Sequence, residues 1–425
     1  MIFGAALSFL SQLDAKGILA VFWFMILLEV PRYAFSFVST GAAHALAGLR
    51  RKPRADRWRR RPTVSVIIAG HNEAGAMRPC LRSLAEQTLL PDEIICINDG
   101  STDGMRRVLG ELREEGLIDA AFTNELRCGK PAACNLAINF SRGDIVINVD
   151  ADCSFDRDAL ERIIEPLSDP AVGAVSGNIG VRNAERSIVA SLQAIEYLTS
   201  ISLGKLSMDV HEMVFCASGA FSAFRREALL QVGSLEPGPG EDFDLTLRLH
   251  RAGWKIRFAG AAWCFTDVPE TLPALIRQRR RWDRDTIRLR LRKFHGTLNP
   301  LNRRFQLRPL LDQFDFLILN LGSTLIFPLY IGWMFWTYGG LAWCLLTAVS
   351  IVYMAFDLLT FLVAVAVTGR YGLLRLLPFA IGFGVFNAYV MRAMRLYAYF
   401  EEWVFRASYR DAYVPQRVLD QSPLY

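Results

Sequence analysis

Apolar positions follow two kinds of pattern along the 425-residue chain. Residues 17–39 form a long apolar stretch, and further stretches cover 316–336, 341–367 and about 373–391. A helix of about 20 mostly apolar residues is long enough to cross a bilayer. Residues 62–270 instead alternate short apolar runs with amphipathic segments, as globular domains do. The pattern therefore predicts a globular domain flanked by membrane-spanning helices.

The N-terminal apolar stretch is interrupted by Glu29, Pro31 and Arg32. Charges inside a membrane are costly unless they are paired. One interpretation is a kinked span whose charges lie near an interface or face other helices. The other is that Glu29 lines a polar conduit. No basic segment precedes the stretch and no clear cleavage site follows it, which disfavours a signal peptide.

Within the globular part, the pattern predicts strands and helices in alternation. Apolar, β-branched runs at 63–70, 92–99 and 144–152 indicate strands, and residues 78–88 and 103–116 have helical spacing. Such alternation is typical of a parallel sheet with helices on both faces, which collects ligands at the carboxyl ends of its strands. We therefore expect an α/β domain with its site at that edge.

Charge places this domain beside a membrane. The net charge is +6, and arginines cluster at 50–61 and 277–308, next to the apolar stretches. Basic flanks favour a cytoplasmic location and lipid contact, so nucleic acid is not an expected partner. Three C-terminal spans would place the C-terminal tail outside, whereas the arginines after residue 391 favour an inside location. Alternatively, part of 373–410 is an amphipathic helix that lies along the membrane interface. The eight cysteines have no metal-binding spacing, as in a reduced cytoplasmic domain.

Asp99 and Lys130 lie at the ends of expected elements, one after a strand and one before a helix. Asp99 ends the second strand, where a carboxylate can accept a hydrogen bond from a ribose hydroxyl or a base N–H. The surrounding stretch 98–104 is equally typical of a turn and a helix cap. Lys130 lies in a Gly/Pro loop before a helix, where it can reach a nucleotide phosphate or base. That loop lacks the residue order of a P-loop, which disfavours an ATPase.

The stretch "DAD" places Asp150 and Asp152 after a strongly apolar strand. Carboxylates this close repel each other unless a cation or hydrogen-bond donors neutralise them. Mg²⁺ or Mn²⁺ prefers oxygen ligands and usually shares its shell with substrate phosphates. The spacing predicts a metal–diphosphate site, and the alternative is a solvated strand end whose acids cap the next helix.

The stretch "GED" brings Asp242 to the start of a helical pattern. An acid there commonly stabilises the helix N-terminus. Beside a donor site, the same carboxylate is suited to act as the general base that takes the proton of an acceptor hydroxyl.

The stretch "QRRRW" has helical spacing, so Gln278, Arg281 and Trp282 share one face. Arg281 can pair with a leaving diphosphate, and Trp282 can stack on an acceptor sugar. Arg279 and Arg280 are expected to point elsewhere, toward lipid phosphates. A basic collar beside a membrane is the alternative interpretation of the whole stretch.

In this order, the motifs resemble the processive, membrane-embedded family 2 glycosyltransferases, which include cellulose, hyaluronan, chitin and poly-N-acetylglucosamine synthases. The resemblance covers about 60–300 in detail. "GHNE" resembles the nucleotide-binding first loop and brings Asn72 and Glu73 to the donor. "FCASGAF" is similar to the acceptor-side segment and places Cys216 near the growing chain end. The stretch 175–183 is most similar to N-acetylhexosamine polymer synthases.

The resemblance implies a GT-A fold, a UDP-sugar donor, Mg²⁺ or Mn²⁺, and inversion at the anomeric carbon. The implied site consists of the base Asp242, the donor contacts Asn72, Glu73, Asp99, Lys130, Asp150 and Arg281, the metal ligands Asp150 and Asp152, and the acceptor contacts Cys216, Gln278 and Trp282.

These observations define the expected organisation. It comprises an N-terminal transmembrane segment (1–49), a basic linker (50–61), a GT-A domain (62–270), interface helices with the QRRRW motif (271–315), C-terminal transmembrane helices (316–410) and a tail (411–425). The expected function is processive synthesis of a β-linked polysaccharide, of N-acetylglucosamine or glucose, and its translocation across a bacterial inner membrane from a cytoplasmic catalytic domain. Expected partners are the growing chain, membrane lipids and accessory or periplasmic export subunits. Transfer of one sugar to a lipid carrier, or a non-enzymatic scaffold that senses nucleotide, are the alternatives.

Overall fold

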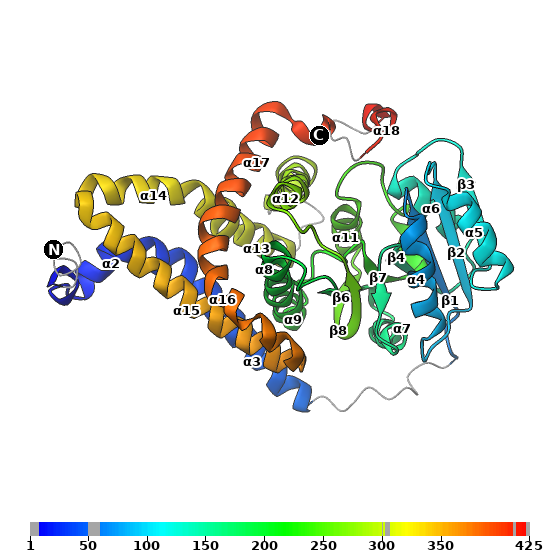
Figure 1. Ribbon diagram of the computed structural model, residues 1–425, viewed down its shortest axis with the longest axis horizontal. Coiled ribbons are helices and arrows are strands. Elements are labelled where there is room, and N and C mark those ends of the chain that lie inside the picture. Colours follow the sequence, from blue (N-terminus) through cyan, green and yellow to red (C-terminus); the bar gives the residue numbers. More distant parts are fainter. Residues whose placement is uncertain (1–7, 50–59, 300, 302–306, 411–413, 422–425) are drawn as a thin grey trace.

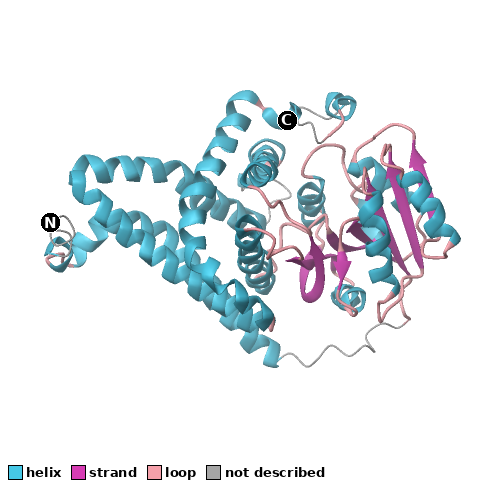
Figure 2. Ribbon diagram, viewed as in Figure 1, coloured by secondary structure: helices cyan, strands magenta, loops and turns pink. Residues whose placement is uncertain are grey.

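The computed structural model describes residues 8–49, 60–299, 301, 307–410 and 414–421. Most of the basic linker and part of the tail lie outside the described residues. Figure 1 shows a globular part built on a sheet and an elongated part built of helices, and Figure 2 shows that the described strands all lie in the globular part.

The described strands form one mixed, mostly parallel sheet in the order β3-β2-β1-β4-β7-β6-β8-β5. Its first half, β3-β2-β1-β4, is parallel, and β7 runs antiparallel to both β4 and β6. The strands are β1 (Val64–Gly70), β2 (Glu93–Asp99), β3 (Ala120–Asn124), β4 (Ile145–Asp150), β5 (Ser154–Phe155), β6 (Val172–Val181), β7 (Phe221–Arg225) and β8 (Lys255–Thr266). The predicted α/β sheet is confirmed, and the three predicted strands correspond to β1, β2 and β4.

Apolar strands are explained by helices that cover both faces of this sheet. In β1, Val66 and Ile68 belong to the core beneath α4 and α5, whereas Ile67 belongs to the core beneath α6 and α11. The helices of the globular part are α4 (Ala74–Ala85), α5 (Met105–Glu114), α6 (Lys130–Phe140), α7 (Ala159–Ile164), α8 (Ile188–Glu196), α9 (Gly204–Val210), α10 (Arg226–Gln231), α11 (Glu241–Arg251) and α12 (Leu272–Ile287).

The helical part carries the long apolar stretches. Among the described residues, Ala15–Ala42, Leu307–Thr368 and Tyr371–Phe405 are long and apolar enough to cross a membrane. The second stretch turns back at Gly339, which has a φ of +52°, so α14 and α15 form a hairpin (Figure 1). The helices here are α2 (Ala15–Phe24), α3 (Val30–Leu49), α13 (Leu307–Asp315), α14 (Ser323–Tyr338), α15 (Ala342–Thr368), α16 (Leu377–Val385) and α17 (Arg392–Phe405), followed by α18 (Gln416–Gln421).

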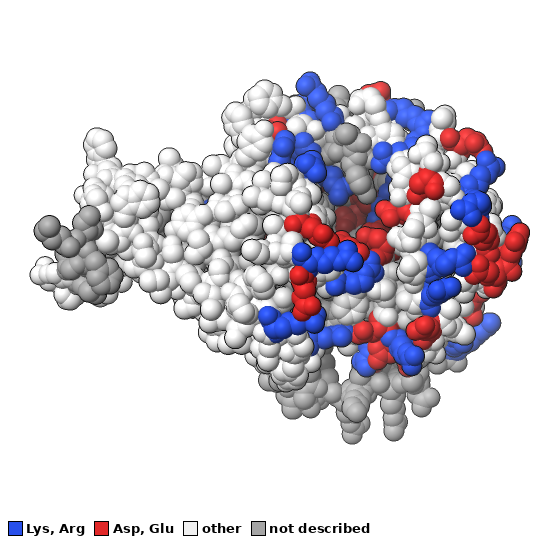
Figure 3. All heavy atoms as spheres, in the orientation of Figure 1, with Lys and Arg blue, Asp and Glu red and all other residues white. Residues whose placement is uncertain are grey.

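Charge separates the two parts. Lys, Arg, Asp and Glu cover the globular part in Figure 3, and the face of the helical part seen there is almost free of them. Glu29 is buried but lies 2.5 Å from Arg392 of α17, so this charge faces another helix, as the first interpretation of the interrupted span expected. Pairing of this kind is what makes an intramembrane ion tolerable.

The last apolar segment extends beyond its predicted end near residue 391. Helix α17 continues to Phe405 because its arginines face protein carboxylates: Arg392 faces Glu29, and Arg395 lies 3.7 Å from Asp283 of α12. Its other face exposes aromatic rings, among them Trp403. Two of the arginines that conflicted with a third span are thus internal ion-pair partners.

Candidate active site

The first loop of the site follows β1 and is tied to the loop that follows β2. Asn72 has a left-handed backbone with a φ of 61°, a region that asparagine tolerates better than most residues. Its backbone N–H donates to Ser101 Oγ at 2.9 Å, and its Oδ1 accepts from the Thr102 N–H at 2.8 Å. The parallel neighbours β1 and β2 therefore bring "GHNE" and "NDGSTDG" together at the carboxyl edge.

Asp99 is buried at the end of β2 and organises the loop before α6. Its carboxylate accepts from the backbone N–H groups of Cys128 and Gly129, both at 2.7 Å, and from Asn124 Nδ2 at 2.9 Å. These bonds set the start of α6 and hence the position of Lys130. Contact between Asp99 and a donor molecule stays a prediction.

Lys130 is the side chain that connects the two halves of the candidate site. Its ammonium forms an ion pair with Asp150, at the end of β4. It also lies 3.3 Å from the carbonyl oxygen of Gly219 and 3.9 Å from Glu241 Oε1. Lys130 thus contacts the acidic strand end, the 214–220 segment and the start of α11 at once.

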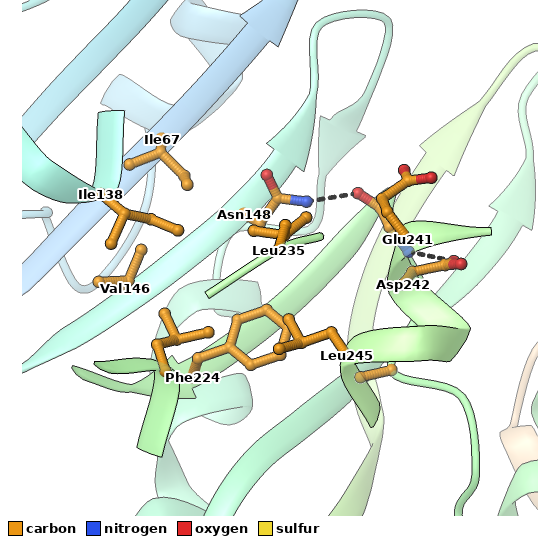
Figure 4. A pocket seen from close by; sticks show the side chains of 12 residues that line it. Ile67, Ile138, Val146, Asn148, Phe224, Leu235, Glu241, Asp242 and Leu245 are labelled. Atoms are coloured by element: carbon orange, nitrogen blue, oxygen red, sulfur yellow. Dashed lines mark hydrogen bonds between the residues drawn. The ribbon is translucent and has the colours of Figure 1, made fainter. Parts of the chain in front are cut away.

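Asp242 occupies the first turn of α11 and is held from the same segment. The Gly219 N–H donates to Asp242 Oδ2 at 2.9 Å, and Cys216 Sγ lies 3.9 Å from that oxygen. Figure 4 shows Glu241 and Asp242 beside Asn148 at the polar end of a small, mostly apolar cavity. Asp150, Lys130, Gly219 and Asp242 are therefore linked by successive polar contacts. Burial, and then Asp242, raise the pKa of the Cys216 thiol to about 12.

The acids near β4 form a region of concentrated negative charge. Burial, and then Asp152 and Asp150, raise the pKa of Glu73 to about 7. Burial also raises the pKa of Asp150, although Lys130 acts against it. Thr266 Oγ1 donates to Asp152 Oδ2 at 2.9 Å, which orients this second acid. Figure 3 shows acidic atoms inside a hollow of the globular part, with basic side chains at its rim.

This charge fits a divalent cation. Burial is the main cause of the raised pKa values of Glu73 and Asp150, and the neighbouring carboxylates add to it by repulsion, which a cation would relieve. Within the described residues, no three His, Cys, Asp or Glu side chains are grouped to hold a metal alone. Asp150 and Asp152 suit an ion of the Mg²⁺ type, which takes one or two carboxylates and fills its shell with phosphate oxygens and water.

The raised pKa of Glu73 predicts that the stability of the folded protein depends on pH. Its pKa is higher in the folded protein than its ordinary value, so the folded state holds a proton that the unfolded chain has lost between those two values. The contribution of Glu73 to stability is therefore fully present below the ordinary pKa value and is lost as the pH rises toward about 7. We expect Glu73→Gln to reduce this fall between pH 5 and 8, measured by thermal unfolding in EDTA. Glu86→Gln, at an exposed position after α4, is the control; equal slopes for Glu73→Gln and wild type would contradict the assignment.

The QRRRW stretch forms part of α12, as predicted, but two of its arginines do not face lipid. Arg279 is buried and donates to Glu196 at 2.7 Å. Arg280 pairs with Glu401 of α17 at 2.6 Å. The expectation of lipid phosphates was wrong because α8 and α17, distant in sequence, supply carboxylates on both sides of α12.

Trp282 remains partly exposed, at 39%, although one side of its ring is covered. The guanidinium of Arg279 lies 4.2 Å from the ring centroid, one helical turn away. Gln278 is half-buried and its Oε1 has no hydrogen-bond partner among the described residues. Arg281 is half-buried on the same helix. The structure thus leaves part of the Trp282 ring accessible.

Several contributors were not predicted from sequence. Gly219 acts through its backbone, which no side-chain pattern reveals, and Thr266 comes from the far end of β8. The tail also reaches the site: Arg417 donates to the carbonyl of Arg127, and Pro415 packs near Gly129. The only available signal was the row of small residues "CASGA", which permits a close backbone approach.

Comparison with known proteins agrees with this geometry. Residues 65–233 match the family model described as Glycosyl transferase family 2. Over these residues the chain is similar to family 2 glycosyltransferases. The match covers the loops that hold Asn72, Asp99 and Lys130, the acids after β4, and Gly219.

Named relatives extend the similarity. Poly-beta-1,6-N-acetyl-D-glucosamine synthase of Staphylococcus aureus (strain MSSA476) is 33% identical over 246 residues, which are 57% of this chain and 59% of that protein. The protein of the same description from Staphylococcus epidermidis is 33% identical over 238 residues, 55% of this chain and 57% of its own length. The similarity thus spans less than two thirds of these curated relatives.

The fold is also shared with a solved structure. A mannosyltransferase from Pyrobaculum calidifontis, in complex with GDP-Man and Mn²⁺, superposes with a TM-score of 0.61 at 21% identity, covering 83% of this chain and 99% of that one. At this identity the likeness concerns the fold alone. It confirms the predicted GT-A type of sheet for the glycosyltransferase domain.

Proposed function

We propose that the protein polymerises N-acetylglucosamine from UDP-N-acetylglucosamine into a β-linked polysaccharide. The observation that carries this proposal is the contact made by Lys130, which joins the acidic strand end to the segment that holds Asp242. A donor site and a base for the acceptor are thus neighbours. The choice of sugar is supported by the names of the relatives and by their similarity to this chain.

On the donor side, Asp150 and Asp152 would hold Mg²⁺ or Mn²⁺ together with the diphosphate. The bound ion would supply positive charge to offset the charge that develops on the leaving UDP. Lys130 lies at the same acids and is suited to bind a phosphate oxygen once the donor competes for its ion pair. Arg281 of α12 is proposed to act on the same diphosphate.

On the acceptor side, Asp242 would take the proton of the acceptor hydroxyl as its oxygen bonds to the anomeric carbon and the bond to UDP breaks. The attack comes from the face opposite UDP, so the anomeric configuration inverts. The Gly219 N–H fixes one carboxylate oxygen of Asp242. Cys216 lies beside that oxygen, and Trp282 offers a ring on which the terminal sugar can stack.

The apolar helices support a membrane role. We propose that α14, α15 and α17, with α2 and α3, span a bacterial inner membrane, keep the catalytic domain cytoplasmic and pass the growing chain across. Export subunits on the far side are proposed partners. The ion pairs Arg280–Glu401 and Arg395–Asp283 support a fixed position of α12 against α17.

The test is turnover by purified membranes. Membranes that contain the protein are incubated with a panel of UDP-sugars and Mg²⁺ or Mn²⁺, and the product is sized and digested with linkage-specific hydrolases. Long, hydrolase-sensitive chains from UDP-N-acetylglucosamine are expected. A product with one sugar on a lipid would favour the non-processive alternative, and UDP binding without turnover would favour a sensing scaffold.

Arg279 yields a further prediction about chain length. Arg279→Leu removes the cation from one face of Trp282 and should loosen the ring. Because a cation–π contact contributes about 0.5–2 kcal/mol, we expect acceptor KM to rise roughly twofold to thirtyfold and the polymer to shorten. Arg279→Leu also removes the ion pair between Arg279 and Glu196. Glu196→Gln breaks that ion pair but leaves the arginine over the ring, so this matched variant should have a smaller effect. Normal chain length in Arg279→Leu would contradict this role.

A further inference from the structure

Lys205 is a half-buried lysine in the glycosyltransferase domain that the proposed chemistry does not use. It lies on α9, and its Nζ donates to Ser176 Oγ at 2.9 Å and to Ser218 Oγ at 2.5 Å. Within the described part of the chain, no carboxylate lies within ion-pair distance of this ammonium. Burial lowers the pKa of Lys205, with Cys216 and Asp242 acting in the opposite direction.

Two hydroxyls do not satisfy an ammonium. The group has three N–H donors and no acceptor, and two of the donors are used by the serines. The residue is half-buried, so its remaining donor needs an oxygen partner at this position.

The position of Lys205 indicates that its third N–H lies on the acceptor side of the site. Lys130 and Lys205 contact adjoining residues of one segment: Lys130 binds the Gly219 carbonyl and Asp150, whereas Lys205 binds the Ser218 hydroxyl. The titratable neighbours that act on Lys205 are Cys216, Asp242 and Cys264, and they do not include Asp150 or Asp152. Lys205 therefore adjoins the base and the cysteine, away from the diphosphate side.

We propose that Lys205 binds an oxygen of the terminal sugar of the acceptor chain and thereby helps to select that sugar. The inference rests on the proposed function. The ligand is a neutral oxygen, either a hydroxyl or the acetamido carbonyl, placed within reach of the third N–H. Ser176 and Ser218 hold the ammonium in position, one from β6 and one from the segment that also fixes Asp242.

The experiment measures binding of a β-1,6-linked N-acetylglucosamine tetramer to the full-length protein in nanodiscs with UDP and Mn²⁺ present. Lys205→Met is expected to weaken tetramer binding about tenfold, with UDP affinity within twofold of wild type. Lys205→Arg, which keeps the charge and the donors, should lose less. Lys255→Met is the matched control, because Lys255 pairs with Glu212 at the start of β8.

A β-1,6-linked glucose tetramer separates the two oxygens. It has the hydroxyls but no acetamido group, so equal weakening of both tetramers identifies a hydroxyl, and weakening of the N-acetylglucosamine tetramer alone identifies the carbonyl. Unchanged tetramer binding in Lys205→Met overturns the inference. So does an equal loss of UDP and tetramer affinity in both Lys205 variants, which would make the residue structural.

Failure of the proposed function is a separate result. Wild-type protein that makes polymer, with a Lys205→Met variant that binds the tetramer normally, overturns only the role of Lys205. Wild-type protein that neither polymerises a UDP-sugar nor binds either tetramer overturns the proposed function itself.

Discussion

Asp242→Asn is expected to abolish polymer formation while the donor still binds. The amide is nearly isosteric and can accept the Gly219 N–H, but it cannot take a proton from the acceptor hydroxyl. General base catalysis contributes typically 10²–10⁴-fold, so turnover should fall by at least about a hundredfold. The measurement is sugar incorporation from UDP-N-acetylglucosamine, together with UDP affinity.

The same variant separates catalysis from helix capping. If Asp242 only stabilised the N-terminus of α11, Asn would lose a charge–dipole interaction of about 0.3–1 kcal/mol, and turnover would stay near wild type. Glu227→Gln is the control, since Glu227 is an exposed acid in the first turn of α10. Wild-type turnover in Asp242→Asn would remove Asp242 from the mechanism.

Removal of divalent metal is expected to have an effect of similar size. EDTA should stop turnover, and Mn²⁺ or Mg²⁺ should restore it, because Asp150 and Asp152 repel each other and the diphosphate unless a cation lies between them. Asp152→Asn removes one charged ligand, so we expect half-saturation by Mn²⁺ to need at least about tenfold more metal. Mn²⁺ binding in the presence of UDP, followed by electron paramagnetic resonance, measures this independently of activity.

Asp158→Asn is the matched control for the metal experiment. Asp158 pairs with Arg162 at the surface of α7, outside the acidic strand end. Its substitution should leave the metal requirement unchanged. Full turnover in EDTA, or unaltered Mn²⁺ binding by Asp152→Asn, would contradict a metal held by these acids.

The local pattern of apolar and polar residues was enough to predict many elements of the fold. Strands β1, β2 and β4 begin and end within two residues of the predicted runs, because strands buried on both faces have continuous apolar sequences. The QRRRW stretch was predicted to be helical and lies within α12, and the acids of the GED stretch were predicted at the start of a helix and lie in the first turn of α11. The long apolar stretches indicated membrane helices for the same reason: a bilayer imposes its requirement on consecutive residues.

Candidate site residues were recognisable where one short motif carries the chemistry. The sequence indicated Asp150, Asp152 and Asp242 as candidates because an acid at a strand end or helix start can bind a metal, act as a base or cap a helix. The structure adds that Asp150 and Asp242 are connected through Lys130 and Gly219. That their roles are catalytic stays a prediction until the variants are measured.

The sequence by itself determined the α/β alternation, the apolar spans and the acidic strand end, since each depends on neighbours within about one element. Only the tertiary structure decided the partners of charges. Glu29 meets Arg392, and Arg279 and Arg280 meet carboxylates of α8 and α17. Lys205 lies where three distant segments converge. These contacts depend on how whole elements pack, and no local pattern of side chains encodes that geometry.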